Sequence, residues 1–321
     1  MLIPVLLFIV GFIFLIKGGD WFVDGATGIA HKFHIPELLI GATVVSIGTT
    51  LPEVMVSATS AVSGHGEIAY GNAIGSIICN TSLIAALTIA IKPSEVDRKT
   101  FLTPVIFFWV SAAVYVFVAA EFQYFSRPVG LVLLALFVIY IITVILQQKN
   151  QSSTVENAIE NADDSPLWKN IILLVAGAAL IAYGSDLLVD NGTLIAVALG
   201  VPESVVALTF VALGTSLPEL VTAISSLVKG HGALSLGNII GANLFNIVLV
   251  SGVSVTLSPF SLPQSKLIGN MNSSLVVDIP VMIFVMLLLT LPAALRQKLS
   301  RIQGIALLVV YSAFCVFQFI S

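Results

Sequence analysis

The chain has 321 residues, of which 58% are apolar and 9% charged, and its formal net charge is −4. In soluble domains about a quarter of the residues are charged. The composition of this chain is far more apolar, which excludes a soluble protein. With a mean hydropathy of +1.07, the chain is expected to be surrounded by the lipid bilayer. Nothing in the composition indicates a nucleic-acid partner or an obligate protein partner.

The apolar runs have the length that a helix needs to cross a hydrocarbon core of about 30 Å. A helix also satisfies its own backbone hydrogen bonds in lipid, so we expect an all-α integral membrane protein with ten transmembrane helices. The expected spans are about 3–30, 37–62, 68–91, 101–120, 128–147, 169–197, 203–228, 233–257, 273–292 and 302–320.

A polar stretch separates the first five spans from the last five. It is rich in Asn, Gln, Ser, Glu and Asp, a composition that favours a flexible hydrophilic linker. We therefore divide the chain into a first repeat at 1–147, a linker at 148–168 and a second repeat at 169–321.

The two halves of the chain are copies of one another. Residues 43–80 align with 209–246 at an offset of 166 without a gap, and 17 of the 38 positions are identical. Because five is odd, the second half must enter the membrane from the opposite side, which gives the inverted-topology repeat typical of secondary transporters. We expect ion-binding motifs within 43–82 and 209–248.

Positive charge is distributed unevenly over the expected loops. With the N-terminus outside, the inner loops hold ten Lys and Arg residues and the outer loops only Arg127 and Lys266. Positively charged loops stay in the cytoplasm. We therefore expect a multi-pass protein of the cell membrane with both termini outside and the central linker cytoplasmic.

Each half carries one glutamate within an apolar span, Glu53 in Gly-Thr-Thr-Leu-Pro-Glu and Glu219 in Gly-Thr-Ser-Leu-Pro-Glu. A carboxylate at mid-membrane costs about 3 kcal/mol on insertion scales unless it is paired, protonated or bound to a cation. Inversion should bring Glu53 and Glu219 together, and no Lys or Arg lies in either motif. A cation site explains this matched pair better than a structural, hydrogen-bonded glutamic acid does.

Hydroxyl side chains precede each glutamate by three and four residues, which places them on its helical face. They are Thr49, Thr50, Thr215 and Ser216. A proline lacks the N–H and crowds the carbonyl four residues back, so the helices should kink or loosen at Gly48, Pro52, Gly214 and Pro218. Carboxylates, hydroxyls and carbonyls without His or Cys are the ligands of a hard cation such as Ca2+.

The next span of each half carries a stripe of residues spaced by four. The stripe contains Asn72, Ser76 and Asn80 in the first copy, and Asn238, Ala242 and Asn246 in the second. A polar stripe in lipid points inward, so we expect Asn80 and Asn246 to bind ions. Asn72 and Asn238 have two equally good interpretations, as ion ligands or as residues that form interhelical hydrogen bonds. Gly75 and Gly241 should permit close packing or a kink.

These doubled motifs, with Gly-Asn-x-Ile-Gly-(Ser/Ala)-x-x-x-Asn in the second span, resemble the α-repeats of the cation/Ca2+ exchanger superfamily, nearest to prokaryotic Na+/Ca2+ exchangers. The resemblance covers nearly all of the chain. It implies that Glu53 and Glu219 are the central Ca2+ ligands shared with Na+. The four hydroxyl residues and Ser76, Asn80 and Asn246 would assist, together with the backbone carbonyls of Ser46 and Ala212. The first and sixth spans would slide across the rest.

Two positions depart from the pattern of that superfamily. Several relatives carry Asp at the position of Asn246, and many carry Ser at the position of Ala242. The first difference leaves only two carboxylates at the centre and weakens any case for K+ co-transport. The second removes a hydroxyl that resembles an outer Na+ ligand, so the counter-ion stays open between Na+ and H+.

We therefore expect a secondary active antiporter, not an enzyme, that exchanges Na+ for Ca2+ by alternating access and uses no cofactor. The alternatives are a H+/Ca2+ exchanger on the same scaffold and, less favoured, a cation channel. No span offers a Ser/Lys pair, a paired aspartate motif or a His-x-x-x-His metal site for an intramembrane enzyme.

Four aspartates lie toward the ends of the first and sixth spans. They are Asp20, Asp24, Asp186 and Asp190. We expect them at solvated helix ends rather than in a cation vestibule. Lys17 should snorkel to the interface or pair with Asp20.

Overall fold

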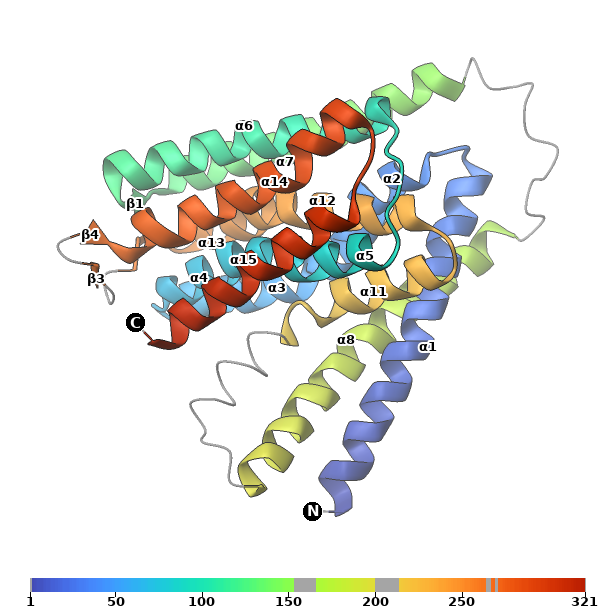
Figure 1. Cartoon of the computed structure of the whole chain (residues 1–321), viewed down its shortest axis with the longest axis horizontal. Helices are drawn as coiled ribbons and strands as arrows, with labels where there is room; N and C mark the ends of the chain where they lie inside the picture. Colours follow the sequence, from blue (N-terminus) through green and yellow to red (C-terminus); the bar gives the residue numbers. More distant parts are fainter. Residues whose placement is uncertain (1, 153–165, 200–213, 264–266, 269–270, 321) are drawn as a thin grey trace.

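The computed structural model describes residues 2–152, 166–199, 214–263, 267–268 and 271–320 (Figure 1). Within these ranges, nine helical stretches are long and apolar enough to cross a membrane. A shorter apolar helix covers Leu217–Val228, and residues 203–213 of the expected seventh span lie outside the described residues. The expectation of an all-helical membrane protein is confirmed.

The helices of the first half follow the expected runs closely, and η denotes a π-helical segment. They are α1 (Leu2–Lys32), α2 (Glu37–Ile40), η1 (Gly41–Val45), α3 (Ser46–Val62), α4 (Gly66–Cys79), η2 (Asn80–Ala85), α5 (Ala86–Ile91), α6 (Arg98–Phe122) and α7 (Arg127–Ser152). Asp97 caps α6, because its carboxylate accepts bonds from the backbone N–H groups of Lys99 and Thr100.

The described helices of the second half repeat this order. They are α8 (Leu167–Ala198), α11 (Leu217–Val228), α12 (Gly232–Phe245), η4 (Asn246–Ser251), α13 (Gly252–Leu257), η5 (Ser274–Asp278), α14 (Ile279–Arg296) and α15 (Arg301–Ile320). Two short antiparallel strand pairs, which hydropathy does not predict, lie in the loops. They join β1 (Tyr124–Phe125) to β2 (Phe260–Ser261), and β3 (Leu267–Ile268) to β4 (Met271–Asn272).

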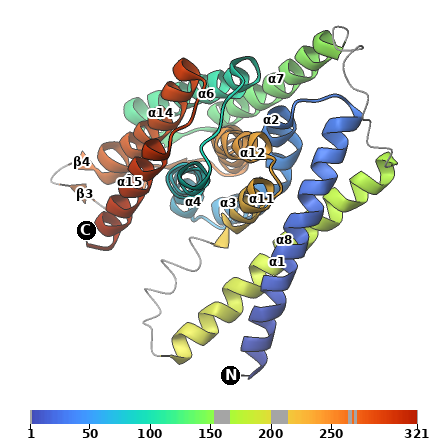
Figure 2. The ribbon, with the colours of Figure 1, turned by 45° about the vertical axis from the view of Figure 1, so that its right-hand side comes forward.

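Four helices, α3, α4, α11 and α12, form the centre of the molecule, and Figure 2 views them nearly end-on. On one side they are covered by α6, α7, α14 and α15, and on the other by α1 and α8. The hydroxyl of Tyr140 on α7 donates a 2.8 Å hydrogen bond to the carbonyl of Ala42 in η1. This hydrogen bond connects the outer helix α7 to the π-helical segment η1, which leads into the central helix α3.

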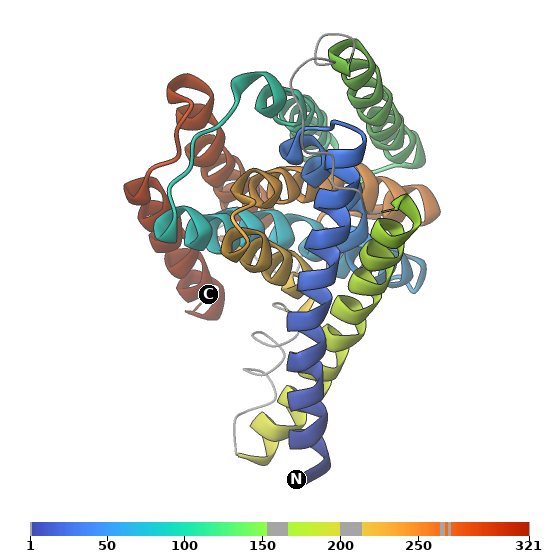
Figure 3. The same ribbon diagram turned by 90° about the vertical axis from the view of Figure 1, so that its right-hand side faces the viewer.

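The helices α1 and α8 form a long antiparallel pair that extends beyond the rest of the bundle (Figures 1 and 3). Glycines spaced by seven line the contact: Gly11, Gly18 and Gly25 on α1, and Gly177 and Gly184 on α8. A Cβ at Gly11 would lie 2.9 Å from the carbonyl oxygen of Gly184. Small residues let helix backbones approach closely in membranes. The contact between α1 and α8 is therefore what mainly holds these two helices together.

Two π-helical segments occupy equivalent places in the halves. The segments η2 and η4 begin at Asn80 and Asn246, which the repeat offset of 166 relates. In η4 the Ser251 hydroxyl donates to the Asn246 carbonyl five residues earlier, at 3.0 Å. Isolated π turns occur frequently at functional sites, and both of these begin at an asparagine of the polar stripe.

Candidate cation-binding site

The structure brings Glu53 and Glu219 together at the centre of the bundle. Glu53 lies in the middle of α3 and Glu219 in the first turn of α11, and both side chains are fully buried. They are close enough for their charges to repel. None of the four carboxylate oxygens accepts a well-formed hydrogen bond from a described residue. Buried carboxylates of this kind require a proton or a cation to compensate their charge.

Hydroxyls from both halves lie beside the glutamates. Thr49 and Thr50 on α3 and Ser216 before α11 are buried, and the hydroxyls of Thr50 and Ser216 make no hydrogen bond with a described residue. Thr49 is near enough to Glu219 to interact with its carboxylate. The site therefore contains oxygen atoms from both copies of the motif. Thr215 is only half-buried, in the turn that precedes α11.

The two proline motifs differ in backbone structure. In the second copy the helix is interrupted at Thr215 and Ser216, and Pro218 lies in the first turn of α11, where its missing N–H costs nothing. In the first copy α3 continues through Pro52, and the widened turn lies upstream in η1. The kink or loosening expected at each of the two motifs stays a prediction.

Ser46 explains how η1 stays wide. Its hydroxyl has two carbonyl acceptors within reach of its single proton, that of Gly41, five residues earlier, at 2.7 Å, and that of Asn238 on α12, at 2.9 Å. The Ser46 carbonyl, expected as an ion ligand, lies 3.4 Å from the Thr49 hydroxyl. Ala212, its counterpart in the second half, lies outside the described residues.

Asn80 and Asn246 are fully buried and differ in their hydrogen bonds. Neither amide atom of Asn80 has a partner among the described residues. The Asn246 Nδ2 donates to the Ala242 carbonyl at 3.0 Å, which leaves its Oδ1 without such a partner. Each asparagine can thus present a carbonyl oxygen. Ser76, one turn before Asn80, is also buried.

The structure separates the roles of Asn72 and Asn238. Asn72 donates to the Glu53 carbonyl at 3.2 Å and to the Ser57 hydroxyl at 2.8 Å, so it binds α4 to α3. Asn238 accepts the Thr49 hydroxyl at its Oδ1, at 3.2 Å, and its Nδ2 has no partner among the described residues. Ser57 was not anticipated, although it follows Glu53 by one helical turn.

Glycines of the motifs allow close approach, with one correction. A Cβ at Gly241 would lie 2.6 Å from the Ala42 Cα. Cβ atoms at Gly48 and Gly214 would meet Phe22 of α1 and Val189 of α8 at 3.0 Å and 2.7 Å. For Gly75, no described atom lies within 4 Å of that position, and this glycine lines a pocket. Close packing at Gly75 is therefore not seen among the described residues, and the alternative of a kink stays a prediction.

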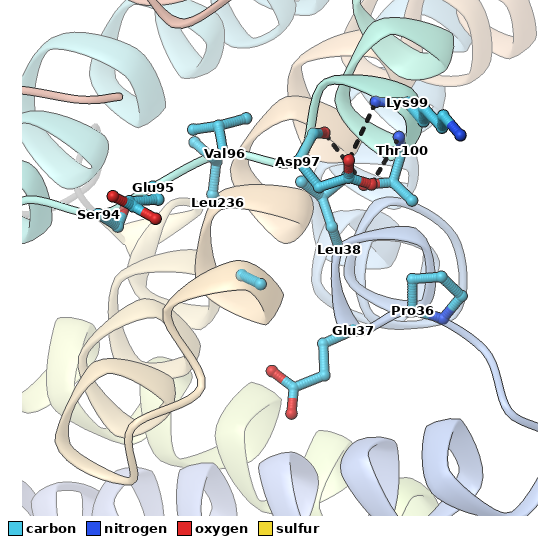
Figure 4. A pocket seen from close by; sticks show the side chains of 11 residues that line it. Pro36, Glu37, Leu38, Ser94, Glu95, Val96, Asp97, Lys99, Thr100 and Leu236 are labelled. Carbon is cyan, nitrogen blue, oxygen red and sulfur yellow. Dashed lines mark hydrogen bonds between the residues drawn. The ribbon is translucent and has the colours of Figure 1, made fainter. Parts of the chain in front are cut away.

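A surface pocket of about 470 Å3 lies away from the glutamates and contains three acids, Glu37, Glu95 and Asp97 (Figure 4). Asp97 caps α6, and Glu95 is 3.2 Å from Lys298. Glu37 lies 2.7 Å from His231. Because each acid has a partner, this pocket does not compete with the central pair as the cation site.

The aspartates of α1 are not simply solvated. The Nζ of Lys229, which follows α11, lies 2.7 Å from the Asp24 carboxylate and 2.8 Å from the Asp20 carbonyl. Lys229, and not Lys17, is therefore the ion-pair partner of α1. The sequence pattern gave no signal for this contact between residues more than 200 positions apart.

A helical membrane bundle around two buried carboxylates defines an ion transporter. The family model described as sodium/calcium exchanger protein matches residues 3–146 and 169–320, and the chain belongs to that family. It is 32% identical to the putative antiporter CaxA of Alkalimonas amylolytica over 100% of both chains. It is 31% identical to the sodium/calcium exchanger MaX1 of Methanosarcina acetivorans over 98% of both.

Solved structures of the sodium-calcium exchanger NCX_Mj share the fold. One of them, soaked with Na+ and Sr2+, superposes with a TM-score of 0.80 at 34% identity over 97% of each chain. The family and the fold identify the protein as a cation/Ca2+ antiporter and as a transporter rather than an enzyme. The resemblance inferred from the sequence is confirmed.

Proposed function

We propose that the protein exchanges Na+ for Ca2+ at a site centred on Glu53 and Glu219. The observation that carries this proposal is the pair itself: two fully buried carboxylates from equivalent positions, without hydrogen-bond partners among the described residues. The names of MaX1 and NCX_Mj, both sodium/calcium exchangers, support Na+ as the counter-ion.

The ligands of the transported cations are oxygen atoms, the set that Ca2+ and Na+ require. Around the two carboxylates we propose the side chains of Thr49, Thr50, Ser76, Asn80, Thr215, Ser216 and Asn246 and the backbone carbonyls of Ser46 and Ala212. Asn238 contributes through its amide group, whereas Asn72 is a positioning residue that holds the Glu53 backbone. Asn80 and Asn246 act as neutral ligands through amide oxygens that have no partner among the described residues.

Competition for one pair of charges produces the exchange. Two carboxylates balance either one divalent ion or two monovalent ions, so loading with one kind displaces the other. A dianionic site without ions is too costly to enclose in a low dielectric. Only the loaded site therefore changes its exposure from one side of the membrane to the other.

The movement that we propose is a sliding of the α1/α8 pair across the centre. Phe22 covers Gly48, Val189 covers Gly214, and the space enclosed near them is only about 10 Å3. Such contacts between flat glycine surfaces and apolar side chains present few obstacles to sliding. The NCX_Mj structures concern extracellular ion exchange and induced binding-site occlusion, which agrees with a site that opens and closes.

We also propose ten spans in two inverted repeats, 1–147 and 169–321, joined by a cytoplasmic linker at 148–168, with both termini outside. The internal duplication supports this organisation, and the family model likewise matches two segments separated at the linker. The inner end of the bundle then carries Lys92 and Lys229.

Flux of 45Ca2+ in proteoliposomes tests the site. Glu53→Gln and Glu219→Gln each remove one charge from a buried cluster, worth about 3 kcal/mol or more, so Na+-driven Ca2+ uptake should fall on the order of a hundredfold. Glu121→Gln, at the exposed end of α6, is the matched control and should transport normally. Normal exchange by both central variants would refute the site.

The same vesicles separate the rival functions. Uptake that follows a Na+ gradient at fixed pH supports Na+/Ca2+ exchange, and uptake that follows only a pH gradient supports the H+/Ca2+ alternative. Acceleration by Ca2+ on the opposite side is expected of an exchanger, whereas unitary currents without a counter-ion would indicate a channel.

A further inference from the structure

Many buried hydroxyls in the described helices bond to their own helix. Ser and Thr commonly donate to the carbonyl four residues back. Those that do so include Thr27, Ser82, Ser185, Ser254 and Thr290. Besides Ser216 of the candidate site, three hydroxyls of the second half, those of Thr222, Ser226 and Ser235, are buried and form no hydrogen bond with any described residue. We call these three residues the hydroxyl row.

The hydroxyl row begins one turn beyond Glu219. Glu219, Thr222 and Ser226 are separated by three and four residues, so they lie along one face of α11. The short turn after α11 then leads to α12, where the backbone N–H of His231 bonds to the Ser226 carbonyl at 2.7 Å. Ser235 follows on the first turn of α12. The row thus leads from the central carboxylate toward the end of the α11–α12 hairpin.

At that end the row reaches a pocket of about 280 Å3. Ser235 lines it together with Leu227 at the end of α11 and Lys92 after α5. A second pocket, drawn in Figure 4, shares Ser94, Ala233 and Leu236 with the first. These pockets lie at the end of the bundle that carries Lys92 and Lys229, the inner end in the proposed topology.

We infer that the hydroxyl row is the inner access path of the transported cation, along which hydroxyl oxygens replace hydration water between the pocket and Glu219. The inference rests on the proposed function. A buried hydroxyl without a partner costs about 1–3 kcal/mol. Three such groups in sequence toward a buried carboxylate are explained by a polar species that passes them, and a hard cation is served by their oxygens.

The first repeat does not duplicate the hydroxyl row. The repeat offset relates Thr222, Ser226 and Ser235 to Val56, Ser60 and Ala69, so a single hydroxyl remains. Val56 is also exposed on the surface of the bundle. The outer route must therefore use other groups, and loss of the hydroxyl row should affect only one face of the membrane.

Oriented membrane vesicles test this one-sided effect. Thr222→Val, Ser226→Ala and Ser235→Ala remove each hydroxyl while keeping a side chain of similar size. We expect each to raise the apparent KM for Ca2+ at the inner face about fivefold, which corresponds to about 1 kcal/mol, and to leave the outer KM within about twofold. The control is Ser254→Ala, whose hydroxyl bonds to the Val250 carbonyl at 2.8 Å and which should change neither KM.

Thiol labelling gives a second readout that does not depend on kinetics. Ser226→Cys and Ser235→Cys, compared with the chain that has only its native Cys79 and Cys315, should react with a membrane-impermeant cationic thiol reagent applied from the inner face. Ca2+ should slow that reaction. Equal KM changes at both faces, or labelling only from the outer face, would overturn the inference. Loss of exchange in the wild-type chain would instead refute the proposed function.

Discussion

Replacing Lys229 by Met should shift the balance between the two orientations of the transporter. Lys229 Nζ donates to the Asp24 carboxylate at 2.7 Å and to the Asp20 carbonyl at 2.8 Å, and it lies 3.7 Å from the Asp20 carboxylate. These contacts fasten α1, an element of the proposed sliding pair, to the turn after α11. Ser63 occupies the equivalent place in the first half, and a serine side chain cannot form this ion pair.

The magnitude follows from exposure. The side chains of Lys229 and Asp24 are 24% and 53% exposed, so solvent screens the ion pair and limits it to about 0.5–1 kcal/mol. The partly buried bond to the Asp20 carbonyl brings the total to about 1 kcal/mol. A free-energy change of 1.4 kcal/mol alters an equilibrium constant tenfold. The equilibrium between the two orientations should therefore shift about fivefold toward the orientation in which α1 has moved away from Lys229.

The assay is the ratio of the Ca2+ KM values at the two faces in oriented vesicles. Lys229→Met and Asp24→Asn should change this ratio in the same direction, and the double variant should change it little more than Lys229→Met alone, since both remove one contact. Raising the salt concentration should diminish the difference from wild type. Fully additive effects, or an unchanged ratio in the double variant, would refute the fastening of α1 by this contact.

Two further substitutions test packing and charge. Gly237→Ala should destabilise the protein by about 2 kcal/mol or more, measured as a lower thermal midpoint in detergent, because its Cβ would overlap the Leu38 backbone, whereas Gly75→Ala should be tolerated. Asn246→Asp adds a third carboxylate to the proposed site, and two unit charges about 4 Å apart interact by about 4 kcal/mol at an effective dielectric of 20. It should tighten Ca2+ binding at alkaline pH and make 45Ca2+ uptake fall more steeply on acidification, and an unchanged pH profile would place Asn246 away from the ions.

The central pair was predictable because symmetry determines it. Two copies of one motif, separated by the odd number of spans expected from the sequence, are predicted to meet from opposite sides of the membrane. Glu53 and Glu219 are accordingly near enough to repel in the structure. Hydropathy likewise predicts the helices, since lipid leaves a chain segment little alternative to a helix.

The remaining features depend on contacts that neither periodicity nor symmetry contains. Asn72 and Asn238 are equivalent in sequence, yet one bonds to the Glu53 carbonyl and the other to the Thr49 hydroxyl. The π turn at η1 depends on Ser46, whose hydroxyl also reaches a helix of the other half. Such bonds depend on which helix lies opposite, so the composition of a single span does not predict them.

In the proposed inverted repeat, differences between the halves carry functional information, because equal halves would make the two proposed orientations equal in energy. The chain departs from equality at the site, where Asn246 bonds to Ala242 while Asn80 has no described partner. It departs again away from the site, where Lys229 stands opposite Ser63 in the alignment. A ligand shifts a conformational equilibrium only by its difference in affinity between the states. Residues outside the ion site can therefore set different apparent affinities at the two faces without any change in the ligands.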